Sequence, residues 1–250
     1  MELSGKVALV TGGGAGIGRA IALAFAEAGA DVAVLDLVSQ AAAAVADEVR
    51  GMGRRAVAVT ASVSDAGQVA EAVEATVEAL GGIDILVNNA GFARASASVL
   101  DVPESQWDTV LDVNLKGPFL LAKAVLPHMR KRGPGGRIIN ISSLAGRSVS
   151  VFMGSDYTAS KAGLLGLTRH LARELASEGI TVNVVCPGST ETEFMLNLPA
   201  KIREEAVKAI PMGRYGTPKD IADVVLFVAS ERSRYMTGAT LDVNGGRLMI

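Results

Sequence analysis

The sequence has little cysteine, no long hydrophobic run and no excess of either charge, and each absence excludes a class of protein. One cysteine cannot form an internal disulfide, so the chain does not need an oxidising compartment. Lys plus Arg number 24 and Asp plus Glu number 26, which argues against nucleic acid or an anionic membrane as a partner. Runs such as Val7–Val10 are far shorter than the roughly 20 residues that cross a bilayer. We expect a soluble, cytoplasmic protein that acts on a small molecule.

The 250 residues, 49% of them apolar, are enough for one domain, over residues 1–250, with a large core. Short continuous runs rich in Val and Ile alternate with helical patterns, which is typical of strands buried on both faces of a parallel sheet. The predicted strands are Val7–Val10, Asp31–Leu35, Ala56–Thr60, Ile83–Val87, Arg137–Ile141, Thr181–Val185 and Thr240–Val243. The predicted helices are Ile17–Ala28, Gln40–Gly51, Ala66–Leu80, Glu104–Arg130, Ser155–Glu178 and Lys219–Ser230. This alternation predicts an α/β fold with helices on both faces of the sheet.

A glycine-rich turn joins the first predicted strand to the first predicted helix. It reads Thr11-Gly-Gly-Gly-Ala-Gly-Ile-Gly18, which fits the pattern Thr-Gly-x-x-x-Gly-x-Gly. Glycines let backbone N–H groups approach a phosphate, and the helix N-terminus adds partial positive charge. We therefore expect a cofactor-binding loop rather than a merely flexible turn. The residues expected to contact the cofactor here are Gly12, Gly14, Gly16, Ile17 and Gly18.

An acidic residue ends the second predicted strand. Asp36 follows Gly12 by 24 residues, and a carboxylate at that place accepts hydrogen bonds from a ribose diol and repels a 2′-phosphate. Its neighbours Leu37 and Val38, and Ala15 within the glycine turn, bring no positive charge. The sequence therefore favours NAD over NADP as the cofactor. The alternative is that Asp36 only caps a helix or a turn.

A tyrosine and a lysine lie four residues apart in Tyr157-Thr-Ala-Ser-Lys161, near the start of a predicted helix. Residues at this spacing share one face of a helix. A free tyrosine has a pKa near ~10 and is a weak base at neutral pH. An ammonium group nearby favours the phenolate and lowers that pKa. A tyrosine tuned in this way can exchange a proton with an alcohol or carbonyl oxygen.

Further short motifs follow one another along the chain. In order they are Thr11–Gly18, Asn88-Asn-Ala-Gly91, Asn114, Asn140-Ile-Ser-Ser143, Tyr157–Lys161, Pro187-Gly188 with Thr192, and Thr237-Gly238 with Asn244-Gly-Gly246. Their joint occurrence, over essentially the whole chain, resembles the single-domain branch of the short-chain dehydrogenase/reductase family. The resemblance implies a doubly wound Rossmann fold with a seven-stranded parallel sheet. It also implies metal-free hydride transfer between a secondary alcohol or ketone and NAD(P), and a homo-oligomer, either a tetramer or a dimer.

The resemblance implies a role for each matching residue. Tyr157 would be the catalytic acid/base, Lys161 would lower its pKa and hold the nicotinamide ribose, and Ser143 would hydrogen-bond the substrate oxygen. Asn114 would support a water chain between Lys161 and solvent. The other implied cofactor contacts are Ser62 and Val63 near the adenine, Asn89, Ala90 and Gly91 near the adenosine half, and Pro187, Gly188, Thr190 and Thr192 near the nicotinamide and diphosphate.

The sequence departs from the family's pattern at two places. Ser62 stands where many relatives have an aspartate, which weakens the expected side-chain contact with adenine. Ser143 precedes Tyr157 by 14 residues, one more than is common in the family, and Ser142 is the alternative. We prefer Ser143 because it fills the last place of the Ile-Ser-Ser motif. The extra residue then lengthens the loop Leu144–Asp156, which borders the substrate.

Substrate choice falls to the loops around the predicted site. Phe152, Met153, Phe194 and Met195 are predicted as apolar walls of the substrate pocket, with simple loop packing as the alternative. The irregular segment of about residues 189–217 follows a strand end and is predicted as a mobile flap. The apolar and small side chains of these loops favour an apolar or cyclic alcohol or a 3-hydroxyacyl (3-oxoacyl) group.

Two other functions are open at this point. An NAD(H)-binding regulator without turnover would keep the fold, but the intact Ser143, Tyr157 and Lys161 argue against it. A non-redox enzyme on the same scaffold, such as a relative that eliminates halide from a halohydrin, would lack the glycine loop and carry Arg in place of the lysine. The glycines and Lys161 argue against this alternative.

Overall fold

Seven parallel strands form one sheet in the order β3-β2-β1-β4-β5-β6-β7. The computed structural model describes residues 1–150, 152–192 and 200–250. The strands are β1 (Val7–Thr11), β2 (Asp31–Asp36), β3 (Ala56–Thr60), β4 (Ile85–Asn88), β5 (Arg137–Ile141), β6 (Thr181–Pro187) and β7 (Thr240–Val243). Central strands such as β1 and β4 are buried along their whole length, which explains their continuous apolar runs. The predicted seven-stranded parallel sheet is confirmed.

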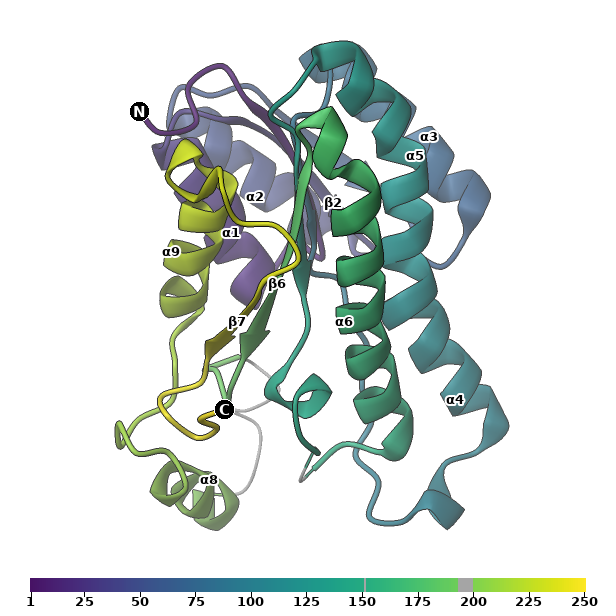
Figure 1. Ribbon diagram of the computed structural model, residues 1–250, viewed down its shortest axis with the longest axis vertical. Coiled ribbons are helices and arrows are strands. Elements are labelled where there is room, and N and C mark those ends of the chain that lie inside the picture. Colours follow the sequence, from purple (N-terminus) through teal and green to yellow (C-terminus); the bar gives the residue numbers. More distant parts are fainter. Residues whose placement is uncertain (151, 193–199) are drawn as a thin grey trace.

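Two layers of helices cover the sheet (Figure 1). One layer contains α1 (Gly16–Glu27), α2 (Ser39–Gly51) and α9 (Pro218–Ala229), which share one apolar core with the sheet. The other contains α3 (Ala66–Leu80), α4 (Glu104–Leu111), α5 (Gly117–Arg132) and α6 (Ser155–Leu175), and α3, α5 and α6 contribute to a second core. Helices on both faces confirm the doubly wound fold. Within the described ranges, no helix is both long and apolar enough to span a bilayer.

The carboxyl ends of the strands point toward the end of the molecule that holds the C-terminus and α8 (Ala200–Lys208) (Figure 1). β1 lies between β2 and β4, so the strand order reverses there, and open α/β sheets bind ligands at such a point. The predicted flap, about residues 189–217, contains α8. Residues 193–199 of that segment lie outside the described part, and the mobility of the flap stays a prediction.

The prediction of one helix over Glu104–Arg130 is wrong in its continuity. A π-helical turn, η2 (Asp112–Lys116), separates α4 from α5. In a regular helix the N–H of residue 118 would donate to the carbonyl of Asn114, but Pro118 has no N–H. The wider turn buries the Asn114 side chain completely. The π-helical turn therefore directs the Asn114 side chain into the interior, beside the segment that follows β4.

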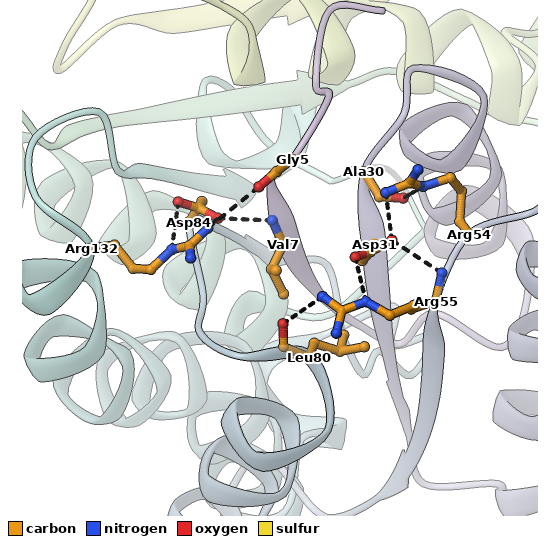
Figure 2. A network of polar contacts seen from close by, with 9 residues as sticks. All are labelled: Gly5, Val7, Ala30, Asp31, Arg54, Arg55, Leu80, Asp84 and Arg132. Atoms are coloured by element: carbon orange, nitrogen blue, oxygen red, sulfur yellow. Dashed lines mark hydrogen bonds and ion pairs between the residues drawn. The ribbon is translucent and has the colours of Figure 1, made fainter.

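A buried carboxylate fastens the opposite, amino-terminal edge of the sheet (Figure 2). Asp84, just before β4, accepts a hydrogen bond from the Val7 N–H at 2.9 Å. The Arg132 guanidinium, from the end of α5, donates to both oxygens of Asp84, at 2.8 and 3.2 Å. This ion pair ties β1, β4 and α5 together at one point.

A second carboxylate does the same for β2 and β3 (Figure 2). Asp31 is buried and accepts hydrogen bonds from the Arg54 side chain at 2.6 Å and the Arg55 side chain at 2.8 Å. Burial raises the pKa of Asp31, but the hydrogen bonds and charges of the two arginines outweigh it, so the pKa lies below its ordinary value. Arg55 also donates to the carbonyl of Leu80, which connects this corner to α3.

Candidate active site

A cavity of about 510 Å³ lies at the carboxyl ends of β4, β5 and β6. The predicted site residues in its wall are Ile17, Asn89, Gly91, Ser143, Phe152, Met153, Tyr157, Lys161, Pro187, Gly188, Thr190 and Thr192. The other described ones, which are not part of this wall, are Gly12, Gly14, Gly16, Gly18, Asp36, Ser62, Val63, Ala90 and Asn114. Phe194 and Met195 lie outside the described residues. The structure thus gathers residues from all over the chain around one cavity.

The glycine turn is closely packed. Gly12 and Gly16 have positive φ angles of 59° and 52°, a region that favours glycine. A Cβ at Gly18 would overlap the carbonyl oxygen of Gly12. Ala15, the residue before α1, has no side-chain oxygen that could cap the helix. Its side chain therefore leaves the N–H groups of the first turn of α1 free to bind a ligand. This end of α1 therefore has the geometry and the partial charge to receive a phosphate.

Thr11 and Asn89 fasten the glycine turn to the end of β4. The Asn89 side chain donates to the carbonyls of Thr11 and Gly12 at 3.0 and 3.1 Å. The Thr11 hydroxyl accepts from the N–H groups of Asn89 and Ala90, both at 3.0 Å, and donates to Val87. The Asn-Asn-Ala-Gly motif thus holds the glycine turn in place through these hydrogen bonds.

Asp36 lies beside the glycine turn. Its carboxylate accepts from the Gly14 N–H at 2.9 Å and from the Val38 N–H at 3.0 Å. The bond from Val38 closes a turn, which is the alternative role considered for Asp36. The bond from Gly14 holds the negative charge of Asp36 beside the glycine turn. At the next strand, the Ser62 hydroxyl bonds to the Ser64 hydroxyl at 2.9 Å.

Tyr157, Lys161 and Ser143 meet on one wall of the cavity. Tyr157 is in the first turn of α6, and the Lys161 Nζ, one turn on, lies 5.8 Å from the centre of its ring. Lys161 is buried and donates from Nζ to the carbonyl of Ile141 at 2.9 Å. Ser143 follows β5 and lowers the pKa of Tyr157 from across the cavity wall, whereas the Ser142 hydroxyl donates to the Lys161 carbonyl at 2.8 Å. The geometry therefore favours Ser143 over Ser142 as the partner of the tyrosine.

Known proteins resemble the chain along its whole length. A family model described as enoyl-(acyl carrier protein) reductase matches residues 12–247. The 3-oxoacyl-[acyl-carrier-protein] reductase FabG of Thermotoga maritima is 42% identical over 246 residues, which are 98% of this chain and 99% of that protein. A short-chain type dehydrogenase/reductase from Mycobacterium marinum superposes with a TM-score of 0.94 at 40% identity, covering 100% of this chain and 98% of the other. The chain belongs to the short-chain dehydrogenase/reductase family.

As a short-chain dehydrogenase/reductase, the protein is an oxidoreductase that uses a nicotinamide cofactor. A short-chain dehydrogenase from Burkholderia cenocepacia, solved in complex with NADP, superposes with a TM-score of 0.92 at 41% identity, and 99% of each chain is covered. The tight glycine turn, the α1 N-terminus without a side-chain cap and the adjacent cavity fit a dinucleotide. The resemblance drawn from the sequence motifs is confirmed.

Burial shifts the pKa values of both Tyr157 and Lys161 in this short-chain dehydrogenase/reductase. Burial raises the pKa of Tyr157, and the hydrogen bond with Ser143 lowers it by less. Burial also lowers the pKa of Lys161 to about 8. The expectation that the lysine lowers the tyrosine pKa is therefore not met in the protein alone, because loss of hydration outweighs the other contributions. At neutral pH Tyr157 therefore keeps its proton, and Lys161, with a pKa of about 8, is still mostly protonated and charged.

Asn114 connects the π-helical turn to the cavity. Its side chain accepts from the Phe92 N–H at 2.8 Å and donates to the Phe92 carbonyl at 2.9 Å, and it also donates to Ser160 at 3.1 Å. These bonds hold the segment after β4 against α6, near Lys161. The water chain expected at Asn114 is a separate role and stays a prediction.

The shifted pKa of Lys161 predicts an unusual pH dependence of stability. The folded protein titrates this lysine at about 8 and the unfolded chain near 10.5, so between these values the unfolded chain binds more protons. The free energy of unfolding therefore rises with pH over this range, by on the order of 2 kcal/mol from this group. The contribution of Lys161 is measured by urea unfolding of the cofactor-free protein and of Lys161→Met at pH 7 and pH 10. It is the difference between the two proteins in free energy of unfolding at each pH. An equal difference at the two pH values would contradict the assignment.

Sequence reasoning did not place Arg247 in the cavity wall, which it lines. Phe92, Val149 and Ser189 also line the cavity, and they lie in segments expected to border the substrate, although none of them was named as a site residue. Arg247 directly follows the Asn244-Gly-Gly246 motif, which comes after the carboxyl end of β7. A signal was available, because residues that follow strand ends in an open α/β sheet face its ligand site.

Proposed function

We propose that the protein is an NAD-dependent dehydrogenase/reductase for secondary alcohols and ketones. The observation that carries the proposal is the meeting of Tyr157, Ser143 and Lys161 on one wall of a cavity beside the glycine turn. In the net reaction a secondary alcohol and NAD⁺ give a ketone, NADH and a proton. The nicotinamide, when bound, supplies the hydride acceptor or donor.

The side chains handle the proton and the substrate oxygen. Tyr157 takes the hydroxyl proton during oxidation and returns it during reduction. Ser143 donates a hydrogen bond to the same oxygen and stabilises the charge that develops there. Lys161 holds the nicotinamide ribose and passes the proton on, through a water chain supported by Asn114. The raised pKa of Tyr157 suits a group that must hold a proton before giving it to a ketone.

The proposed substrate has an apolar body. Phe152 and Met153 lie in the cavity wall together with Phe92, Leu144 and Val149. Such a surface suits an apolar or cyclic alcohol or a 3-hydroxyacyl (3-oxoacyl) group. The name of the Thermotoga relative points to the last of these.

The same proposal includes a homo-oligomer, a tetramer or a dimer. Trp107 on α4 is partly exposed, and Phe119 on α5 is 47% exposed. These apolar side chains on neighbouring helices support contact with a second copy of the chain.

The preference for NAD rests on the Asp36 carboxylate beside the glycine turn. Its charge repels a 2′-phosphate, and Leu37 and Val38 next to it are exposed and uncharged. We expect kcat/KM with NAD to exceed that with NADP by at least about tenfold, since placing like charges together costs several kcal/mol. Asp36→Ser keeps an oxygen acceptor for the turn but removes the charge, so it should bring the ratio close to one.

The test follows NADH and NADPH absorbance with secondary alcohols and 3-hydroxyacyl thioesters, with each cofactor. Asp65→Ser is the matched control, because Asp65 also accepts a backbone N–H, from Gln68, but caps α3 instead. A wild-type preference for NADP would overturn the role of Asp36. Tight NADH binding without turnover of any substrate would favour a regulator that binds NAD(H).

A further inference from the structure

The turn after β7 is built to hold the residue that follows it. The Asn244 side chain accepts from the Gly246 N–H at 3.0 Å and donates to the Leu248 carbonyl at 3.1 Å. Gly245 and Gly246 both have positive φ angles, 64° and 84°, which a residue with a side chain rarely adopts. Arg247 lies inside this closed turn, and its own N–H donates to the Asn244 carbonyl. The position of its backbone is therefore fixed.

The Arg247 side chain extends into the wall of the active-site cavity. Its Nη1 donates to the Ser189 hydroxyl at 2.8 Å. Ser189 follows the Pro187-Gly188 pair at the carboxyl end of β6. In the described part of the chain this is the only hydrogen bond of a guanidinium that has five donors. The remaining donors are available to a ligand.

Arg247 lies on the side of the cavity formed by Ser189 and the turn after β7. A Cβ at Gly16 would lie 3.7 Å from Thr192, so Thr192 marks the end nearest α1. The turn that carries Arg247 instead contacts the segment just before Tyr215, because the Met212 N–H donates to the Gly245 carbonyl at 3.1 Å. Tyr215 packs in one cluster with Phe152, a predicted wall of the substrate pocket. The turn that carries Arg247 thus adjoins a predicted wall of the substrate pocket.

The cavity wall has positive charge and no negative charge to match it. Lys161 and Arg247 are its cations, and no acidic residue is among the described residues that line it. Lys161 is bonded to the Ile141 carbonyl and has its role in proton transfer. Another nearby arginine, Arg147, forms an ion pair with Asp242 at 3.1 Å, whereas Arg247 has no ion pair with any described residue. A partly buried, unmatched guanidinium in an apolar cavity favours an anionic ligand.

We propose that Arg247 binds a carboxylate on the substrate, so that the enzyme acts on hydroxy acids or keto acids whose apolar chain joins the reacting carbon to the carboxylate. Because a guanidinium binds a carboxylate through two parallel hydrogen bonds, it fixes the orientation of the substrate as well as its affinity. Ser189 acts as a positioning residue that holds Arg247. This inference rests on the proposed dehydrogenase function and adds the substrate's charged group to it.

The first test compares acids with their uncharged methyl esters. The substrates are 3-hydroxybutanoate, 4-hydroxypentanoate and 5-hydroxyhexanoate, each beside its methyl ester, with NAD. We expect kcat/KM for the best acid to exceed that of its ester by about ten- to a hundredfold, the range that corresponds to hydrogen bonds with a charged group. Arg247→Met should remove this advantage through KM and leave the ester unaffected. Arg247→Lys should keep part of this advantage, because lysine retains the positive charge but cannot form two parallel hydrogen bonds to a carboxylate.

Arg234→Met is the matched control, because it removes the same charge from an exposed residue beyond the cavity wall. It should leave the ratio of acid to ester unchanged. The proposal fails if esters or thioesters react as well as the acids, or if Arg247→Met weakens both members of each pair equally. It also fails if that substitution weakens NADH binding instead, since Arg247 would then serve the cofactor.

A binding measurement separates this inference from the proposed function. Calorimetry measures hexanoate and hexanamide binding to the wild-type protein and to Arg247→Met, with and without NADH. We expect hexanoate to bind more tightly than hexanamide and to lose about tenfold or more of its affinity in the variant. If no alcohol is oxidised but this difference is found, the dehydrogenase proposal fails and the carboxylate site stands. Equal binding of hexanoate to both proteins overturns the site.

Discussion

Replacing Tyr157 by Phe will lower kcat for alcohol oxidation by about 10²–10⁴-fold, the usual contribution of a positioned general acid or base. The substitution removes one hydroxyl from the cavity wall and leaves the ring in the first turn of α6. Because the tyrosine is held by packing and the glycine turn is untouched, NADH should still bind. The measurement is steady-state absorbance with the best substrate, beside a fluorescence titration with NADH.

Tyr235→Phe is the control for the loss of a phenol, since Tyr235 is fully exposed. It should retain wild-type kcat. Activity of Tyr157→Phe within a few-fold of the wild type would exclude Tyr157 as the acid/base. Loss of NADH binding together with activity would show a role in cofactor binding that is larger than its role in proton transfer.

Replacing Gly18 by Ala will weaken NADH binding and destabilise the fold. The new methyl group overlaps the backbone carbonyl of Gly12 and approaches the Asn89 amide, and neither can move without disturbing the turn. Overpacking of this kind costs about 1–3 kcal/mol, so we expect the Kd for NADH to rise by about ten- to a hundredfold. Urea unfolding and an NADH titration of the same variant measure the two effects.

Gly166→Ala is the matched substitution for this experiment. Gly166 is a helical glycine in α6, and a Cβ there would meet nothing within 4 Å. Alanine has a higher helix propensity than glycine, so this variant should be as stable as the wild type or more stable, by up to about 1 kcal/mol. An unchanged Kd in Gly18→Ala would show that the glycine turn does not approach the cofactor closely.

The strands and the motif residues could be predicted from local sequence, because their signals are local. Val7–Val10 is a continuous apolar run, and burial on both faces leaves that pattern directly. The glycine turn and the Tyr157–Lys161 pair are recognisable by spacing. Their meeting around one cavity follows from the parallel topology, which places all carboxyl strand ends at one edge.

The remaining features depend on packing between distant segments. The break at Asp112–Lys116 adds one wide turn to an otherwise helical pattern, and periodicity does not report it. The pKa of Tyr157 depends on how completely other segments exclude water from it, which the spacing to Lys161 does not contain. Arg247 was overlooked because its place in the cavity follows from the turn around Asn244, and that turn is set by side-chain hydrogen bonds.

The ion pairs of Asp31 and Asp84 lie at the amino-terminal edge of the sheet, and the cavity lies at the carboxyl-terminal edge. The residues that select the substrate are therefore separate from those that tie the strands together. Mutations in the loops around the cavity leave these buried carboxylates and their arginines intact. New substrate preferences can thus evolve by exchange of loop residues while the inherited framework keeps its folding free energy.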